Sequence, residues 1–350
     1  MDLTLDVTDL WEYLSKTDKP VVIYGTGNGA DKIINQLEKR KIKISAIFAS
    51  DGFVRDRYFR GFHVQSFDDV IRAFGDVIVL VSFGSSLANV IDNIKKISSI
   101  CETYAPDVPV IDDGNVFDKN YFADNFEKIK KALSLLSDDE SRNVFINIVR
   151  YKITGKIDYL FNCESDKSEA IKLLNLSDTE SYLDLGAYNG DTVEEFINSV
   201  NGYKDITAVE PDMRNFKKLA HNTNGLHNIC NYNVGISDKD GEMLFSMRGG
   251  RNSSVNGKGN IIKCRCINSL CYQSGVSYIK MDVEGQERAA ILGGANTIKK
   301  YAPKMNIAVY HRNEDIFDLP ILVNSINPNY KLYLRHHPYI PAWDTNLYCI

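Results

Sequence analysis

The sequence has no long hydrophobic run. Its longest apolar stretch, residues 76–83, has the length of a β-strand and falls far short of the ~20 residues that a membrane-spanning helix needs. The first residues also lack a basic segment followed by an apolar one, so we expect no secretory signal. From these absences we expect a cytoplasmic protein without a membrane span.

The sequence also lacks paired cysteines and an excess of charge of one sign. It has 7 cysteines in irregular positions and no C-x-x-C motif. This usage is typical of a reducing compartment, where cysteines serve as small core residues. We expect Cys264 and Cys266 to pack in the core in this way. Because the net charge is −5, nucleic acid is not expected as a partner. Whether the protein associates with itself stays open.

The sequence does contain two regions in which strands and helices alternate. The 350 residues suit two domains of about 150 residues each. Short β-rich runs alternate with segments of helical periodicity over residues 21–114 and again from residue 180. Such alternation predicts parallel sheets covered by helices on both faces. We expect an α/β protein with two Rossmann-like, doubly wound domains, residues 1–114 and 176–350, joined by a helical connector over residues 115–175.

The first domain carries a glycine-rich turn, G-T-G-N-G-A, directly after its first strand. Gly25, Gly27 and Gly29 are close to the dinucleotide fingerprint, but the third glycine comes one residue early. Asp51 ends the next predicted strand, where a ribose-binding acid would lie. Three interpretations stay open: a tight structural turn, a nucleotide or nucleotide-sugar site, and a dinucleotide redox site. Because no hydride-transfer residues stand out in this half, we expect no redox activity there.

A second glycine turn, Y-L-D-L-G-A-Y-N-G-D over residues 182–191, carries acidic residues. Asp184 and Asp191 would repel a phosphate group and attract a cation. Glu210 ends the next predicted strand, where its carboxylate could accept hydrogen bonds from both hydroxyls of a ribose. A ligand with an amino group, a sulfonium and a free ribose diol fits this pattern. S-adenosylmethionine has all three groups.

Motifs over about residues 175–350 resemble the FkbM-type methyltransferase family. They are YLDLGAYNGDT, AVEPD, NVGISDKDG, YIKMDVEGQERAAILGG, AVYHRNEDIFDLPILV and the ending LYLRHH…DTNLYCI. The resemblance implies a class I methyltransferase fold, with a seven-stranded sheet whose last strand is antiparallel. It also implies S-adenosylmethionine as cofactor and a hydroxyl of a sugar or natural product as acceptor. More loosely, the first half resembles Rossmann-like domains of enzymes that modify bacterial surface glycans.

The resemblance also implies roles for individual residues. The glycine turn would hold the methionine part of the cofactor, the acid after the next strand its ribose, and residues 233 and 234 its adenine. The implied cofactor-binding residues are Asp184, Gly186, Ala187, Asn189, Gly190, Asp191, Glu210, Pro211, Asn233, Val234 and Asp282.

Three polar residues at predicted strand ends, Asp282, Glu284 and His311, are candidates for catalysis. A sugar hydroxyl needs a base to remove its proton, and a histidine with an ordinary pKa suits that task. The same side chains could instead hold a divalent cation, although we expect no metal to be essential. Candidate contacts to phosphates of the substrate are Arg251, Arg312, His336 and His337.

The expected function is methyl transfer from S-adenosylmethionine to a hydroxyl of a sugar or glycan precursor. The substrate would be a small-molecule or glycan-linked saccharide. Three alternatives stay open: N-methylation of an amino sugar or amino acid unit of a surface glycan, an oxidoreductase led by the first half, and a non-catalytic module that binds nucleotide-sugars.

Overall fold

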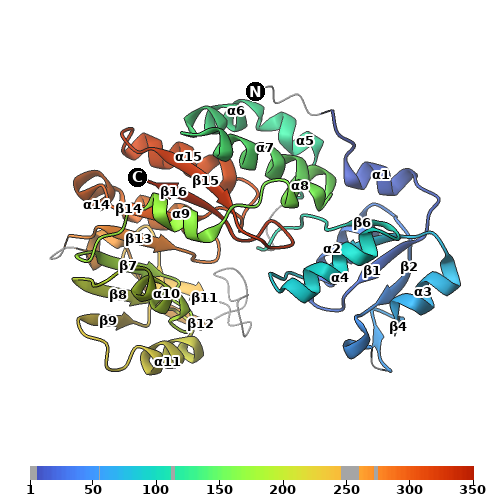
Figure 1. Cartoon of the computed structure of the whole chain (residues 1–350), viewed down its shortest axis with the longest axis horizontal. Coiled ribbons are helices and arrows are strands. Elements are labelled where there is room, and N and C mark those ends of the chain that lie inside the picture. The colour runs from blue at the N-terminus through green and yellow to red at the C-terminus, as the bar shows by residue number, and fades with distance from the viewer. Residues whose placement is uncertain (1–5, 55, 112–114, 246–259, 272–274) are drawn as a thin grey trace.

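The computed structural model describes residues 6–54, 56–111, 115–245, 260–271 and 275–350. Two β-sheets with flanking helices form two halves of an elongated molecule, and further helices connect them along one side (Figure 1). This arrangement confirms the expected α/β class. None of the helices in the described ranges combines the length and the apolar character that crossing a bilayer requires.

The first half is built around one sheet. Its strands are β1 (Val21–Tyr24), β2 (Ile44–Phe48), β3 (Tyr58–Phe59), β4 (Phe62–Gln65), β5 (Ile78–Val81) and β6 (Glu102–Tyr104). Their order is β3-β4-β2-β1-β5-β6, and only the β3–β4 pair is antiparallel. The helices are α1 (Leu10–Lys16), α2 (Asn28–Lys39), α3 (Phe67–Phe74), α4 (Ala88–Ser98) and the 3-10 helix η1 (Asp51–Phe53).

Strand β1 shows why helices cover both faces of this sheet. Every residue of β1 is buried, and successive side chains of a strand point to opposite faces. Val21 and Ile23 pack in a core cluster with apolar residues of α1 and α2. Val22 and Tyr24 pack in a second cluster, with residues of α3 and α4. A fully buried parallel strand needs apolar cover on each side, and the four helices supply it.

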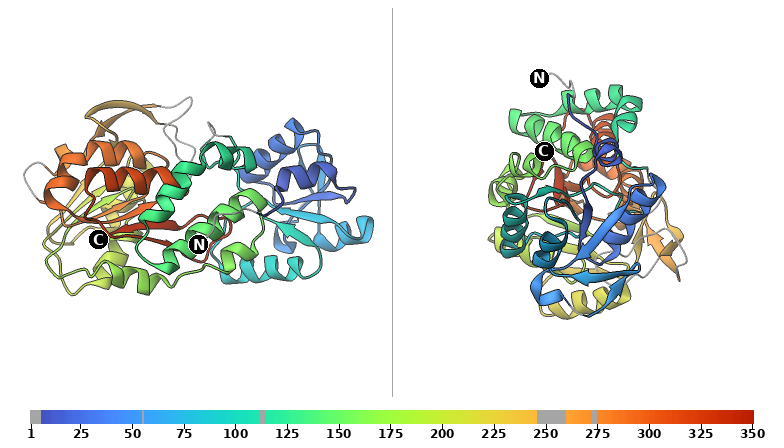
Figure 2. Two further views of the ribbon diagram at one scale, coloured as in Figure 1. Left: turned by 90° about the horizontal axis from the view of Figure 1, so that it is seen from above. Right: turned by 90° about the vertical axis from the view of Figure 1, so that its right-hand side faces the viewer.

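Helices occupy the whole connecting region. They are α5 (Lys119–Asp124), α6 (Phe126–Leu135), α7 (Asp139–Thr154), α8 (Asp158–Phe161) and α9 (Lys167–Leu173). Seen from above, the green connector helices lie between the red helices of the second half and the blue first half (Figure 2). The connector is fastened to the second half by an ion pair of 2.6 Å between Arg335 and Asp138. The domain boundaries near residues 114 and 175 stay a prediction.

The second half contains a large and a small sheet. The strands are β7 (Ser181–Leu185), β8 (Asp205–Val209), β9 (Ile229–Tyr232), β10 (Gly235–Ile236), β11 (Gly241–Phe245), β12 (Asn260–Arg265), β13 (Tyr278–Met281), β14 (Lys304–Ala308), β15 (Leu332–His336) and β16 (Thr345–Cys349). The helices are α10 (Asp191–Ser199), α11 (Met213–Asn222), α12 (Ile267–Leu270), α13 (Glu287–Gly293), α14 (Ala295–Tyr301) and α15 (Asp315–Ile326).

The large sheet has seven strands in the order β15-β16-β14-β13-β7-β8-β9. Strand β16 runs antiparallel to both of its neighbours, and the other adjacent pairs are parallel. The small sheet, β10-β12-β11, contains the antiparallel pair β11 and β12. Parallel strands end at one edge of a sheet, so the residues that follow β7, β8, β13 and β14 meet there.

Candidate active site

A cavity of about 660 Å³ lies between the two halves. Gly27 and Gly29 of the first turn line it, and so do Gly186 and Asp191 of the second turn. The two glycine turns therefore face one cavity and do not serve two separate sites. Lys167 of α9 also lines it, so the connector reaches the cavity.

The second turn is held against the end of β13. Gly186 has a φ of +86°, and a β-carbon on it would lie 1.8 Å from the backbone oxygen of Asp282. Only glycine permits this backbone conformation and this close approach. Lys280 reaches the same place, since its Nζ lies 3.4 Å from the oxygen of Gly186 and 3.9 Å from a carboxylate oxygen of Asp282.

Glu210 lies at the end of β8 and lines the cavity. One of its carboxylate oxygens accepts from the backbone N–H of Tyr188 at 2.9 Å, and the other from that of Asp212 at 2.9 Å. Burial raises the pKa of Glu210 to about 7. Each carboxylate oxygen can accept more than one hydrogen bond, so this residue both shapes the turn and keeps acceptor capacity toward the cavity.

The two acids of the second turn have different environments. Asp191 is exposed and lines the cavity, where its charge can meet a ligand. Asp184 is fully buried, and its carboxylate accepts a hydrogen bond from the Thr192 hydroxyl. Its Oδ1 lies 3.8 Å from Lys280 Nζ. Of the two, Asp191 is therefore the one placed to hold a cationic group directly.

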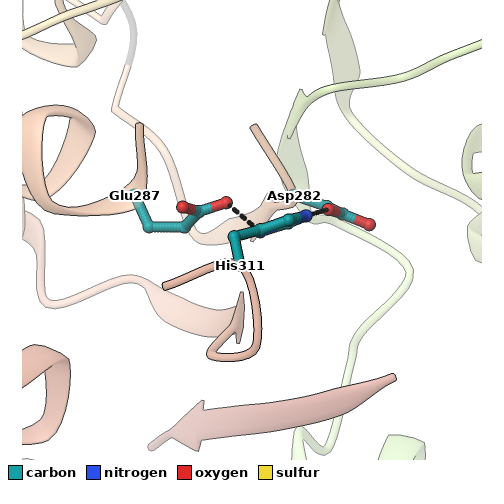
Figure 3. A group of neighbouring side chains, drawn as sticks. All are labelled: Asp282, Glu287 and His311. Carbon is teal, nitrogen blue, oxygen red and sulfur yellow. Dashed lines mark ion pairs between the residues drawn. The ribbon is translucent and has the colours of Figure 1, made fainter. Parts of the chain in front are cut away.

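His311 lies at the centre of a group of carboxylates. Its Nδ1 lies 2.9 Å from Glu287 Oε1, and its Nε2 lies 3.4 Å from Asp282 Oδ1 and 3.5 Å from Glu284 Oε2. Figure 3 shows Glu287 and Asp282 on opposite sides of the imidazole ring. The Tyr310 hydroxyl donates to Asp282 at 3.2 Å. Asp282, Glu284 and His311 all line the cavity, as expected for residues at neighbouring strand ends.

The charges in this group change the role expected for His311. Burial alone would lower the pKa of His311, but the carboxylates of Glu287, Glu284 and Asp282 raise it to about 10. An imidazole that is already protonated near neutral pH cannot accept a proton from a substrate. The structure therefore argues against the expected histidine base, because the surrounding carboxylates keep the ring cationic.

Glu284 is the stronger candidate for a base. Burial raises its pKa to about 8, although the neighbouring His311 cation works in the opposite direction. A base is most effective when its pKa lies near the working pH. Glu284 also has a φ of +52°, which a residue with a β-carbon rarely adopts. Such strained residues are common at functional sites.

A group that could hold a metal ion is present among the described residues. Asp282, Glu287 and His311 each offer one ligand atom, and these atoms lie within 4.8 Å of one another. However, the two carboxylates face different nitrogens on opposite sides of the ring (Figure 3). An imidazole nitrogen that binds an ion has that ion on its own side, so the geometry favours an ion-pair network.

Several residues implied for the cofactor site do not line the cavity. Asn233 donates its side-chain amide to the backbone oxygens of Glu210 and Pro211, at 2.9 and 3.0 Å. Its visible role is thus to hold the end of β8. Pro211 does line the cavity. The implied residues away from it are Asp184, Ala187, Asn189, Gly190, Asn233 and Val234.

The structure also argues against two of the expected substrate contacts. His336 and His337 are buried, and hydrogen bonds join them to Thr345 and Tyr348 of β16, respectively. Burial lowers the pKa of His336 to about 3, so this ring is neutral and cannot attract a phosphate. Both side chains are used in packing the sheet.

The two arginines expected to contact phosphates of the substrate, Arg312 and Arg251, give that expectation little support. Arg312 donates through Nε to the backbone oxygen of Gly285 at 3.0 Å and does not line the cavity. This contact fixes the turn that carries Glu284. Arg251 lies outside the described residues.

Packing explains two glycines of the first turn. A β-carbon on Gly25 would lie 2.7 Å from Ser82 Oγ, and one on Gly29 would lie 2.1 Å from the backbone oxygen of Ser82. Gly27, in contrast, has open space around it. Asp51 begins η1 and does not end β2 as expected, and its side chain lies outside the described part of the structure.

Other cavity residues were not found from the sequence. Lys280 lies inside β13. Glu287, which is buried and does not line the cavity, lies two residues after the DVEG motif, at the start of α13. The cavity-lining residues that the sequence did not identify include Phe83, Tyr188, Lys280, Tyr310, Tyr339, Trp343 and Asp344. Tyr188 and Tyr310 stand next to predicted site residues in the sequence, and Lys280 stands two residues before Asp282. This proximity is the signal that could have identified them.

Comparisons with known proteins agree with this geometry. Residues 184–341 match the family model for the methyltransferase FkbM domain. The crystal structure of methyltransferase FkbM from Methylobacillus flagellatus KT is similar over 95% of this chain and 90% of its own, with 23% identity and a TM-score of 0.72. This likeness shows that the two chains share an architecture that includes the first half.

A more distant match is fibrillarin from Aeropyrum pernix, solved with natively bound S-adenosyl-L-methionine. It covers 53% of this chain and 74% of its own at 16% identity, and its TM-score of 0.33 is too low to bear on the fold. No curated protein sequence matches the chain significantly. The match over residues 184–341 shows that this chain carries an FkbM methyltransferase domain and is an S-adenosylmethionine-dependent methyltransferase.

Proposed function

We propose that this protein transfers a methyl group from S-adenosylmethionine to a hydroxyl of a sugar or glycan precursor, in the cavity between its two halves. The observation that carries the proposal is the position of Glu284. It lines the same cavity as Gly186, and its pKa of about 8 is near working pH. A hydroxyl acceptor needs such a base.

The residues around the second turn fit the cofactor. The close approach of Gly186 to Asp282 leaves no room for a side chain, so the turn offers bare backbone to a ligand. Asp191 would hold the amino group, and Glu210 would accept from the ribose hydroxyls. When bound, the cofactor supplies an electrophilic methyl group on a sulfonium. The carboxylates of this wall favour a cation over a phosphate.

The catalytic step follows from the charges at the strand ends. Glu284 takes the proton of the acceptor hydroxyl, whose oxygen becomes the nucleophile. The His311 cation, fixed from behind by Glu287, positions Glu284 and Asp282 and limits the repulsion between them. The cavity contributes further by holding the acceptor oxygen in line for transfer.

An assay with labelled S-adenosylmethionine over a panel of sugars, amino sugars and nucleotide-sugars tests the proposal, with intact mass as readout. We expect a mass gain of one methyl group on acceptors that carry only hydroxyls. Transfer confined to acceptors with a free amine would favour the N-methylation alternative. No transfer to any saccharide, by a protein that binds the cofactor, would contradict the saccharide assignment.

A further inference from the structure

The first half contributes a wall to the cavity in which the methyl group is transferred. Segments from three of its loops line this cavity: residues 27–32 after β1, residues 82–86 after β5, and residues 108–110 after β6. All three follow strands of the parallel sheet, so they lie at its carboxyl edge. The carboxyl edges of the two sheets therefore face each other across one cavity.

Direct contacts fix this wall to the second half. The backbone groups of Ser85 and Ile340 exchange two hydrogen bonds, of 2.8 and 3.1 Å. A β-carbon on Gly84 would lie 2.5 Å from the ring of Trp343. In Figure 1 the red segment between β15 and β16 extends toward the first half. This segment, residues 337–344, and the loop after β5 form one side of the cavity together.

A second contact reaches the proposed base. A β-carbon on Gly285 would lie 1.8 Å from Ile111 Cδ1, so the Ile111 side chain packs directly on the residue after Glu284. Ile111 is buried, and the three residues before it line the cavity. The chain after β6 thus covers the turn that carries Glu284. Movement of the first half would disturb the catalytic turn.

The chemistry of the first-half wall differs from that of the cofactor side. Among the described cavity residues, the first half contributes no carboxylate and one charged side chain, Lys32. Its other polar groups are neutral, and they come from Asn28, Ser82 and Ser86. The acids that suit a sulfonium all belong to the second half. The first-half wall therefore suits a neutral, hydroxyl-bearing molecule.

Aromatic rings stand beside these neutral groups. Tyr339 and Trp343 have ring centroids 5.9 Å apart, with an angle of 36° between their planes, and both line the cavity with Phe83. A sugar ring has an apolar C–H face that packs on aromatic rings and an edge of hydroxyls that bonds to hydroxyl and amide groups. Pockets commonly combine such apolar surfaces with a few polar groups that fix orientation.

We propose that the acceptor saccharide binds between this first-half wall and residues 337–344 of the second half, with its ring against Tyr339 and Trp343, so that the first half forms part of the acceptor site. The inference rests on the proposed function and assigns the first glycine turn a new role. Gly25 and Gly29 are required by packing against Ser82. Gly27, which has free space, leaves room for the acceptor.

Binding measured through Trp343 tests this assignment. The chain has 2 tryptophans, and the other, Trp11, is buried in α1. We would titrate a panel of methyl glycosides of common hexoses and deoxyhexoses into the full chain with S-adenosylhomocysteine present, and follow the emission. At least one glycoside should change it saturably, and Trp343→Phe should remove the signal.

Two variants of the first half provide the decisive comparison. Gly27→Leu should weaken glycoside binding about tenfold or more by filling the cavity. Gly27→Asn should also weaken glycoside binding, and because asparagine suits the N-cap of α2, it should not impair folding. Gly52→Leu, also in open space but away from the cavity, should bind as wild type does. Calorimetry should show similar affinity for S-adenosylhomocysteine in all of them.

Two results would overturn the inference: unchanged glycoside binding in both Gly27 variants, or no glycoside binding by the wild type. A wild-type protein that fails to bind S-adenosylhomocysteine would instead contradict the proposed function, and this inference with it.

Discussion

The imidazole of His311 and the carboxylate of Glu287 form a buried ion pair, with 2.9 Å between Nδ1 and Oε1. The side chains are 1% and 0% exposed, so solvent screens the pair little. Because Glu287 lies on the side of the ring opposite Asp282 (Figure 3), it fixes both the orientation and the charge of the ring. The other nitrogen is then directed at the carboxylates of the cavity wall.

We predict that His311 remains protonated up to about pH 10 and that Glu287→Gln lowers this pKa. The substitution removes the carboxylate that contributes most to the raised pKa, while burial continues to favour the neutral ring. Histidine NMR titration of wild type and variant checks this. Glu194→Gln, on the exposed face of α10, serves as control. A His311 that titrates near 6.5 in the wild type would contradict the assignment.

Turnover should depend on the protonation of Glu284. A base must be ionised to act, so the rate should rise with pH and level off above about 8, the pKa of Glu284. Glu284→Gln should lower kcat by ~10²–10⁴ and leave affinity for S-adenosylhomocysteine nearly unchanged, whereas Glu194→Gln should keep full turnover. A variant that retains the wild-type rate and pH profile would exclude Glu284 as the base.

The sequence predicted the parts of the site that depend on local pattern. Glu210 and Asp282 directly follow strands, Asp191 begins the helix after β7, and residues at the carboxyl ends of parallel strands meet at one edge. The positive φ of Gly186 is a local requirement of the turn, whereas its close approach to Asp282 depends on the fold. Strand periodicity and turn composition thus indicated that these residues lie together at the cavity, and their roles there stay predictions.

The remaining features depend on contacts between distant segments. Glu287 meets His311 only because α13 packs beside the end of β14, and Tyr339 and Trp343 reach the cavity only because their loop pairs with Ser85. His336 was misjudged because a histidine at a strand end resembles a site residue until its burial is known. The charge of His311 likewise depends on three carboxylates from other elements.

Gly186→Ala should destabilise the protein strongly. The new β-carbon would lie 1.8 Å from the oxygen of Asp282 at a φ of +86°, so the turn or β13 must move. We expect the free energy of unfolding to fall by about 3 kcal/mol or more, measured by urea denaturation. Gly241→Ala, where a β-carbon has open space, is the matched control. Equal stability of the two variants would show that the turn is looser than described.

Removal of metal ions should leave methyl transfer intact. Both nitrogens of His311 already face carboxylates on opposite sides of the ring, so the protonated imidazole occupies the position among these carboxylates that a metal ion would take. The check is an activity assay after EDTA treatment and after addition of magnesium. Activity abolished by EDTA and restored by magnesium would place a metal at Asp282, Glu287 and His311.

Calorimetric titration with S-adenosylhomocysteine and, separately, with NADH tests most directly which glycine turn binds the cofactor. We predict that S-adenosylhomocysteine binds at one site per chain and that NADH does not bind. Glu210→Gln replaces one acceptor oxygen by an amide donor and should weaken binding by ~1.5–3 kcal/mol, while Gly27→Asn should leave it unchanged. Binding of NADH that is lost in Gly27→Asn, together with no binding of S-adenosylhomocysteine, would contradict the account.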